Sequence, residues 1–229
     1  MTESLRDILD AVARGVFPPA DGGTTVVAQH SPRDAGVLCF TAHSVVFTDE
    51  DPVGVPPVER SRDWGRVYES LAATECDALS ASMNPRFLAA LMERTGRTSE
   101  TIDAMLVASP LPGEPPLPLK EIEDAGHPRV AYARRRRDDV RVWAADGGVL
   151  TTGRGIAGRL EVSVEVDEGG RHRGLGRSLV AAARHLVAEP LWAQIAPGNA
   201  RSVRAFQSAG YLPVGSEILL SARRGPRAR

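Results

Sequence analysis

One segment of the chain, residues 161–180 (EVSVEVDEGGRHRGLGRSLV), constrains the fold more than any other. Apolar and polar side chains alternate at its start, which predicts a strand over residues 159–167 with one apolar and one polar face. A glycine-rich loop follows, and the apolar spacing beyond it predicts a helix over residues 175–187. The loop glycines are Gly169, Gly170, Gly174 and Gly176. A strand that passes through such a loop into a helix is typical of α/β folds.

The start of this helix predicts a binding site for an anion. The first N–H groups of a helix have no partners within the helix and lie at the positive end of its dipole. Glycines let the backbone approach a ligand closely, because no Cβ stands in the way. Arg171, Arg173 and Arg177 add positive charge suited to phosphate. The segment therefore predicts a ligand that carries a diphosphate.

A dinucleotide-binding fold would also place a glycine-rich loop before a helix. That fold requires the pattern G-x-G-x-x-G and an acidic residue at the end of the next strand. Here Gly174 and Gly176 are followed by Leu179 in place of the third glycine, and the next predicted strand is followed by Ala196 and Pro197. The dinucleotide interpretation therefore fails at two positions.

Two motifs point to a different family. Residues 171–176 (RHRGLG) resemble the R-x-x-G-x-G signature of the GCN5-related N-acetyltransferases, in which successive amides at the helix start hold the pyrophosphate of acetyl-CoA. Residues 199–211 (NARSVRAFQSAGY) resemble the N-x-x-S-x-R-x-F/Y-x-x-x-G-F/Y segment of the same family, one strand later. Each residue alone has a structural explanation, but the two motifs in this order indicate the family. The resemblance covers about residues 130–220.

The resemblance implies an α/β (α+β) fold with a mixed, splayed β-sheet flanked by helices, preceded by an additional α/β N-terminal region. The pantetheine arm of acetyl-CoA would lie between the strands at residues 159–167 and 191–195 and would pair with the backbone of the first strand. No metal is implied. The residues that the resemblance implies for acetyl-CoA binding are Val164, Val166, Arg171, His172, Arg173, Gly174, Leu175, Gly176, Arg177, Ser178, Asn199 and Phe206.

The family transfers an acetyl group directly from CoA to an amine, which needs a base for the ammonium proton and a proton for the departing thiolate. Glu161 and Glu165 lie on the polar face of the predicted strand, so either is a candidate base, although a solvated strand face explains them equally well. Many family members have Tyr where this chain has Phe206, and a phenyl ring cannot donate a proton. Tyr211 or another group is the candidate replacement; the alternatives are departure through water, or slow or absent transfer.

Two functions are therefore carried forward. The first is an acetyl-CoA-dependent N-acetyltransferase that acts on the primary amine of a small molecule or another amino group. The second is a non-catalytic acyl-CoA-binding or sensor protein with a degenerate site. The sequence identifies neither the acceptor nor the oligomeric state, although members of the family often form homodimers.

The proline-rich segment at residues 109–120 (SPLPGEPPLPLK) excludes a helix or a central strand and suggests a boundary. We expect an N-terminal α/β region over residues 1–110, which is either a degenerate lobe of the same fold or an acceptor-side domain. A proline-rich linker at 111–127, an acetyl-CoA-binding domain at 128–222 and a basic tail at 223–229 complete the prediction.

Local composition predicts the remaining elements. Residues 129–133 and 140–144 are expected to form a hairpin around RRRRDD, with the four arginines at a solvated tip rather than on a nucleic acid. Further strands are expected over residues 24–30, 36–49, 102–108, 191–195 and 214–220. Further helices are expected over residues 64–73, 84–95 (ending at Gly96) and 200–208.

Composition excludes several other classes of protein. The net charge of −1 argues against a dedicated nucleic-acid binder, and no apolar run suggests a membrane span or a signal peptide, so we expect a cytoplasmic protein. Cys39 and Cys76 are too few for a disulfide framework, and the five His show no metal-ligand spacing. We expect no metal, no nucleic acid and no membrane as partners.

Overall fold

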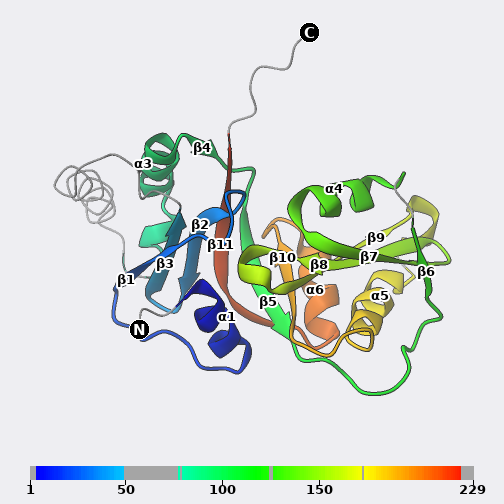
Figure 1. The fold of residues 1–229 in the computed structure, drawn as a ribbon. Helices are drawn as coiled ribbons and strands as arrows, with labels where there is room; N and C mark the ends of the chain where they lie inside the picture. Colours follow the sequence, from blue (N-terminus) through cyan, green and yellow to red (C-terminus); the bar gives the residue numbers. More distant parts are fainter. Residues whose placement is uncertain (1–3, 49–76, 78, 124–125, 172, 223–229) are drawn as a thin grey trace, which may run out of the picture. The chain divides into compact units, whose positions relative to one another are not determined.

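The computed structural model describes residues 4–48, 77, 79–123, 126–171 and 173–222 (Figure 1). The chain divides into two compact units. The first comprises residues 1–103 and 215–229, and the second comprises residues 104–214. Among the helices in these ranges, none is long and apolar enough to cross a membrane.

The first unit contains a mixed sheet with the strand order β1-β3-β2-β11, and β4 pairs separately with β11. β1 runs parallel to β3, whereas β2 runs antiparallel to both β3 and β11. The elements are α1 (Leu5–Ala13), β1 (Thr24–Ala28), β2 (Ala35–Phe40), β3 (His43–Thr48), η1 (Ala81–Met83), α3 (Pro85–Thr95), β4 (Arg97–Thr98) and the final part of β11 (Leu212–Ala222).

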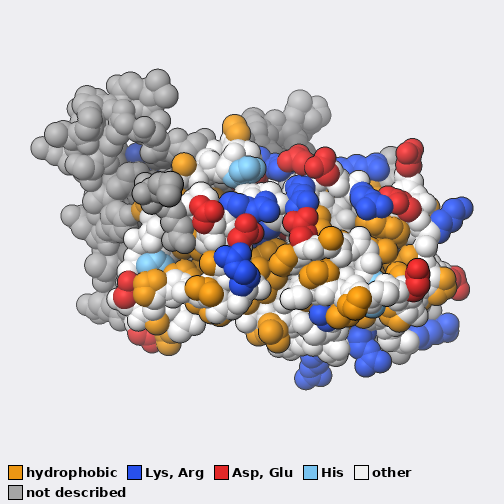
Figure 2. Space-filling model, turned by 60° about the horizontal axis from the view of Figure 1, so that its bottom comes forward, with side chains coloured by type: hydrophobic (Ala, Val, Ile, Leu, Met, Phe, Trp, Pro, Cys, Tyr) orange, Lys and Arg blue, Asp and Glu red, His pale blue; other side chains and the backbone are white. Residues whose placement is uncertain are grey.

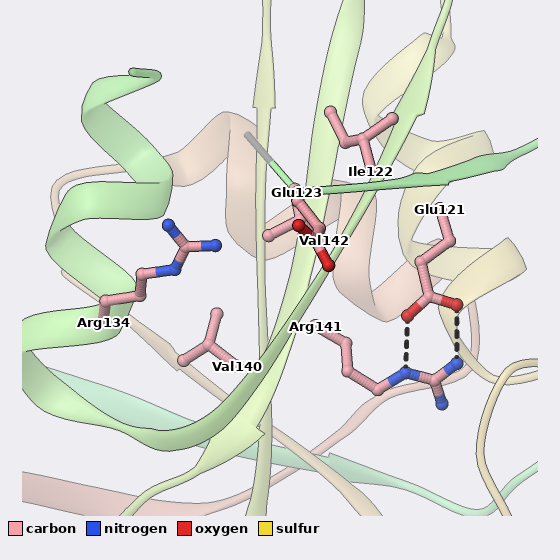
Figure 3. Close-up of a pocket in the computed structure, with 7 residues that line it drawn as sticks. All are labelled: Glu121, Ile122, Glu123, Arg134, Val140, Arg141 and Val142. Atoms are coloured by element: carbon pink, nitrogen blue, oxygen red, sulfur yellow. Dashed lines mark hydrogen bonds and ion pairs between the residues drawn. The ribbon is translucent and has the colours of Figure 1, made fainter. Parts of the chain in front are cut away.

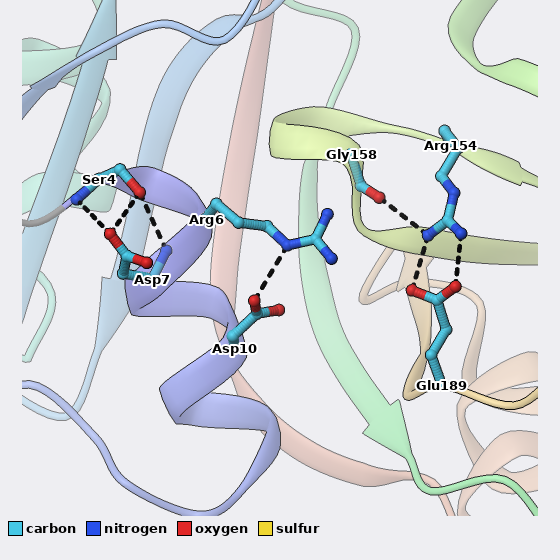
Figure 4. A network of polar contacts seen from close by, with 7 residues as sticks. All are labelled: Ser4, Arg6, Asp7, Asp10, Arg154, Gly158 and Glu189. Carbon is cyan, nitrogen blue, oxygen red and sulfur yellow. Dashed lines mark hydrogen bonds and ion pairs between the residues drawn. The ribbon is translucent and has the colours of Figure 1, made fainter.

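Both α-helices that the structure describes in this unit have strong local start signals. At α1 the Ser4 side chain accepts the N–H of Asp7 while the Asp7 carboxylate accepts the N–H of Ser4, which is a capping box (Figure 4). At α3 Asn84 accepts the N–H of Arg86 at 2.9 Å, and the helix ends at Gly96 with φ of 62°. The predicted helix over residues 84–95, with its glycine cap, is confirmed.

Gly36 of β2 is closely packed in the first unit. A Cβ at Gly36 would lie 2.2 Å from the carbonyl oxygen of Ile218 and 2.9 Å from Cζ of Phe47. Because the paired strand β11 cannot easily move, we expect Gly36→Ala to lower the free energy of unfolding by about 1–3 kcal/mol. Urea unfolding measures this, with Gly198→Ala as the control, since a Cβ there meets nothing within 4 Å. Equal midpoints for the two variants would contradict the packing described.

The second unit contains the strand order β5-β10-β9-β8-β7-β6. All neighbours are antiparallel except β9 and β10, which are parallel. The strands are β5 (Ile102–Ala108), β6 (Lys120–Ile122), β7 (Asp138–Ala145), β8 (Gly148–Arg154), β9 (Leu160–Val166) and β10 (Leu191–Ile195). The helical elements are α4 (Pro128–Arg136), η2 (Ile156–Gly158), η3 (Glu168–Gly170), α5 (Leu175–Ala183) and α6 (Ala200–Ser208).

Helices cover both faces of this sheet, and the side chains of β9 show how (Figure 1). Val162, Val164 and Val166 belong to the apolar core that α5 and α6 complete. On the opposite face, Glu165 bonds to Arg129 of α4. The alternation in residues 159–167 thus produces an apolar face toward α5 and α6 and a polar face toward α4. The expected α/β class, with a mixed sheet flanked by helices, is confirmed.

Most predicted elements of the second half are present with shifted ends. The strands at 102–108 and 191–195 and the helix at 200–208 are confirmed. The helix predicted over 175–187 ends earlier, at Ala183, and the strand predicted over 214–220 is part of the longer β11. The predicted helix at 64–73 and the basic tail at 223–229 lie outside the described residues.

In the first half, the strand predicted over 24–30 is β1, and the stretch 36–49 contains two strands instead of one. The strands β2 and β3 form a hairpin whose turn holds Ala42 at a φ of 53°. The units divide between Asp103 and Ala104 and between Val214 and Gly215. The proline-rich residues 109–120 therefore lie inside the second unit.

The hairpin predicted over residues 129–144 is wrong. Residues 129–133 belong to α4, because Pro128 takes the first helical position and the His127 ring accepts the N–H of Arg129 at 3.1 Å. The arginines that follow favour helix and form its last turn. The true hairpin joins β7 to β8 across a turn in which Gly147 has a φ of 82°.

Candidate functional site

The strands β9 and β10 separate soon after they meet. They pair only at Leu160 with Leu191 and at Glu161 with Trp192. Beyond these pairs β9 continues alongside β8 as far as Val166, whereas β10 continues alongside β5. In the described chain, the edge of β9 from residue 162 to 166 that faces β10 therefore has no strand paired to it. The splay that the family resemblance implies is present.

The start of α5 is open and is not capped by a side chain. Gly174 precedes the helix with a φ of 82°, a conformation that favours glycine, and its carbonyl accepts the N–H of Ser178 at 3.1 Å. A Cβ at Gly174 would meet nothing within 4 Å, and one at Gly176 would meet only Cγ2 of Val166, at 3.6 Å. The space beside the Cα atoms of Gly174 and Gly176, at the start of α5, is therefore largely open.

The predicted arginines lie in the loop before α5 and in its first turn. Arg171, Arg173 and Arg177 are all exposed. Arg171 Nε donates to the carbonyl of Val166 at 3.4 Å, which ties the loop to the end of β9. Leu175 packs against the core of the second unit, and Ser178 is partly buried one helical turn after Gly174. His172 lies outside the described residues.

Three residues of the second motif, residues 199–211, cap a helix or pack in the core. Asn199 caps α6 by accepting the N–H of Ser202 at 3.1 Å. Phe206 is buried and packs edge-to-face against Tyr211, with ring centroids 4.9 Å apart. The hydroxyl of Tyr211 donates to the carbonyl of Val180 at 3.2 Å.

This environment does not favour Tyr211 as an acid. Its side chain is 1% exposed, and burial raises the pKa of its phenol above the usual value. A proton held more tightly, on a hydroxyl already bonded to a backbone carbonyl, is poorly placed to reach a departing thiolate. Both aromatic side chains therefore contribute to the core of the second unit.

The two candidate bases differ sharply. Glu161 is buried, and its Oε2 and Oε1 accept from Arg137 Nε and Arg159 Nε, each at 2.8 Å. Burial by itself would raise the pKa of Glu161, but the two guanidinium charges outweigh burial and lower it. Glu165 is 36% exposed and accepts from Arg129 Nε at 3.1 Å. Glu165 is thus the carboxylate with access to solvent.

No family model matches the chain, and no curated protein matches its sequence. Its structure resembles a GCN5-related N-acetyltransferase from Kribbella flavida, with 20% identity over 85% of this chain and 91% of that chain, at a TM-score of 0.41. The chain is similar to GCN5-related N-acetyltransferases.

Two further structures carry related descriptions. One is a GCN5-related N-acetyltransferase from Sphaerobacter thermophilus, with 16% identity over 61% of this chain and 57% of that chain, at a TM-score of 0.36. The other is from Novosphingobium aromaticivorans and is described as an acetyltransferase of the GNAT family. It shows 18% identity over 56% of this chain and 69% of that chain, at a TM-score of 0.39.

A separate pocket of about 600 Å³ lies between α4, β6 and β7 (Figure 3). Arg141 and Glu121 form a two-pronged ion pair on its wall, with both N–O distances 2.8 Å. None of the residues predicted for acetyl-CoA binding or catalysis lines this pocket. It is lined by Glu121, Ile122, Glu123, Arg134, Val140, Arg141 and Val142.

The arginine run lies at the end of α4 and not at a hairpin tip. Arg135 and Arg136 each lie 5.6 Å from the ring centroid of Tyr132. On the face drawn in Figure 2, basic side chains are interspersed with acidic ones. Within the described residues, no group of three or more His, Cys, Asp or Glu side chains could hold a metal ion.

Proposed function

We propose that the chain is an acetyl-CoA-dependent N-acetyltransferase that transfers an acetyl group directly to a primary amine. The observation that carries this proposal is the separation of β9 from β10. It occurs in the same unit as the uncapped, glycine-lined start of α5. A strand edge without a ladder partner and a helix start without a cap are two polar backbone surfaces that one extended ligand would satisfy. Acetyl-CoA has an amide-containing arm for the strand edge and a diphosphate for the helix start.

The residues present fit this cosubstrate. The diphosphate would be held by the amides of Gly176 and Arg177 and by the exposed arginines of the loop. The pantetheine amides would pair with β9 around Val164 and Val166, in the manner of an added strand. Acetyl-CoA supplies an acetyl group activated as a thioester.

Glu165 is the proposed base for the reaction. Its half-exposed carboxylate lies on the polar face of β9 and would take a proton from the ammonium group of the acceptor, directly or through water. The neutral amine then attacks the thioester carbonyl, the C–N bond forms and the C–S bond breaks. The CoA thiolate takes its proton from water, because the Tyr211 hydroxyl is buried.

Release of free CoA across a panel of primary amines tests catalysis. For an amine that reacts, we expect Glu165→Gln to lower kcat by about 100-fold or more while the acetyl-CoA affinity stays within about twofold. Glu121→Gln is the matched control, because it changes a carboxylate that is paired with an arginine of the same unit but lies on β6. Equal kcat values for Glu165→Gln and the control would contradict the assignment of Glu165.

A non-catalytic acyl-CoA-binding protein is the second candidate function. It is favoured by the environment of Glu161, whose two oxygens are both held by arginines, and by the absence of an exposed phenol at Phe206 or Tyr211. Binding of acetyl-CoA without turnover of any amine in the panel would support this function over transfer.

A further inference from the structure

We propose that Arg137 is a positioning residue that holds β9 and β10 apart, so that the gap for the pantetheine arm is built into the fold. This inference rests on the proposed use of acetyl-CoA. Neither the glycine loop nor the second motif contains Arg137, which lies at the end of the arginine run.

Arg137 reaches both strands from the end of α4. It is the first extended residue after the helix, and its N–H donates to the carbonyl of Ala133 at 2.8 Å. On β9 its Nε donates to Glu161 at 2.8 Å and its Nη1 donates to Ser163 Oγ at 3.2 Å. On β10 its Nη2 donates to Gln194 Oε1 at 3.3 Å. One buried guanidinium thus joins the two strands.

The register of β9 and β10 shows where Arg137 lies along the two strands. Glu161 pairs with Trp192, so a continued parallel ladder would place Ser163 opposite Gln194 on the same face. Arg137 donates hydrogen bonds to both of these side chains. The guanidinium therefore lies over one face of the sheet at the point where the two strands stop pairing.

The bridge is itself fixed by its surroundings. Arg159 donates to the other oxygen of Glu161 and lies 5.2 Å from the ring centroid of Trp192. The backbone leaves room for the network at two glycines, one in β8 and one directly after it. A Cβ at Gly155 would lie 2.1 Å from the carboxylate of Glu161, and one at Gly153 would lie 3.0 Å from Cβ of Arg137. A buried ion network is weak evidence for stability, so we attribute a positioning role to this one.

A positioning role and a purely structural role predict different binding patterns. If Arg137 keeps the gap open, its loss should weaken ligands that enter the gap and spare a ligand that uses only the start of α5. If Arg137 only stabilises the unit, its loss should affect both ligands equally. Acetyl-CoA and 3′-phosphoadenosine 5′-diphosphate, which has the diphosphate but no pantetheine arm, are the two probes.

The test variant is Arg137→Met, which leaves Glu161 neutralised by Arg159. We expect its acetyl-CoA affinity to fall by about 10-fold or more and its affinity for the nucleotide fragment to stay within about twofold. The matched control is Arg154→Met, which removes the two-pronged Arg154–Glu189 pair (Figure 4) and leaves Ser163 and Gln194 untouched. The control should keep both affinities.

Gln194→Ala is the second variant, because it releases only the β10 end of the bridge and keeps the buried ion pairs intact. It should weaken acetyl-CoA by about threefold to fivefold and leave the fragment unchanged. Unchanged acetyl-CoA affinity in both variants, or an equal loss for both probes, would overturn the inference about Arg137 alone. A wild-type chain that binds neither probe would overturn the proposed function and this inference with it.

Discussion

Replacing Gly176 by Asp is expected to remove measurable acetyl-CoA binding while the fold stays intact. Gly176 is the second residue of α5, and a Cβ there meets only Val166 Cγ2, at 3.6 Å. A carboxylate in the first turn of a helix stabilises it by about 0.3–1 kcal/mol. The same carboxylate would lie beside the diphosphate, where two like charges about 4 Å apart near a protein surface repel by about 4 kcal/mol. We therefore expect the affinity to fall by at least about 100-fold.

Calorimetric titration and thermal unfolding of the same samples separate these effects. Gln207→Glu is the control, because it adds the same charge at an exposed position of α6. The control should bind acetyl-CoA within about twofold of the wild type. Wild-type affinity in Gly176→Asp, with an unchanged or raised melting temperature, would show that the start of α5 does not hold the diphosphate.

The second large effect is expected at Glu161. Glu161→Gln leaves Arg137 and Arg159 buried without a counter-charge, so the free energy of unfolding should fall by about 3–5 kcal/mol. Urea unfolding measures the loss. Glu189→Gln, which breaks the half-exposed pair with Arg154, should cost only about 0–1 kcal/mol. Equal losses in the two variants would contradict the buried network.

The same carboxylate gives a pH dependence with a defined sign. The arginines lower the pKa of Glu161 in the folded state, so near its usual value the unfolded chain binds more protons than the folded one. The stability contribution is fully present above the unfolded-state pKa of about 4.3 and is lost as the pH falls through the lower folded-state pKa. The difference in unfolding free energy between wild type and Glu161→Gln should be constant near neutral pH and shrink in acid. A difference that grows in acid would contradict this sign.

The fold could be predicted best where local signals agree. The alternation of β9, the glycines of the loop and the apolar stripe of α5 each specify structure within a few residues. The error at α4 arose because Val130 and Tyr132 favour strands, whereas Pro128 and the cap at His127 favour a helix start. The start signals prevailed, and the adjacent arginines extended the helix.

The candidate site could be predicted from the sequence only in part. The glycine loop is a local motif, so its residues were found together. The contact of Arg137 with Glu161 was not predicted. Arg137 is 24 residues away in the sequence and approaches from a helix that the sequence did not predict. The spacing of Gly153 and Gly155 is the signal that could have shown a bulky buried group beside β8. The polar face of β9 is not simply solvated, since Arg137 and Arg129 bond to its side chains.

Calorimetric titration of the wild-type chain with acetyl-CoA tests the central claim most directly. The proposed function predicts saturable binding of one acetyl-CoA per chain, with a Kd below about 100 μM, because one ligand would use both the helix start and the open strand edge. Absence of binding at millimolar acetyl-CoA would contradict the account, for transfer and for non-catalytic binding alike.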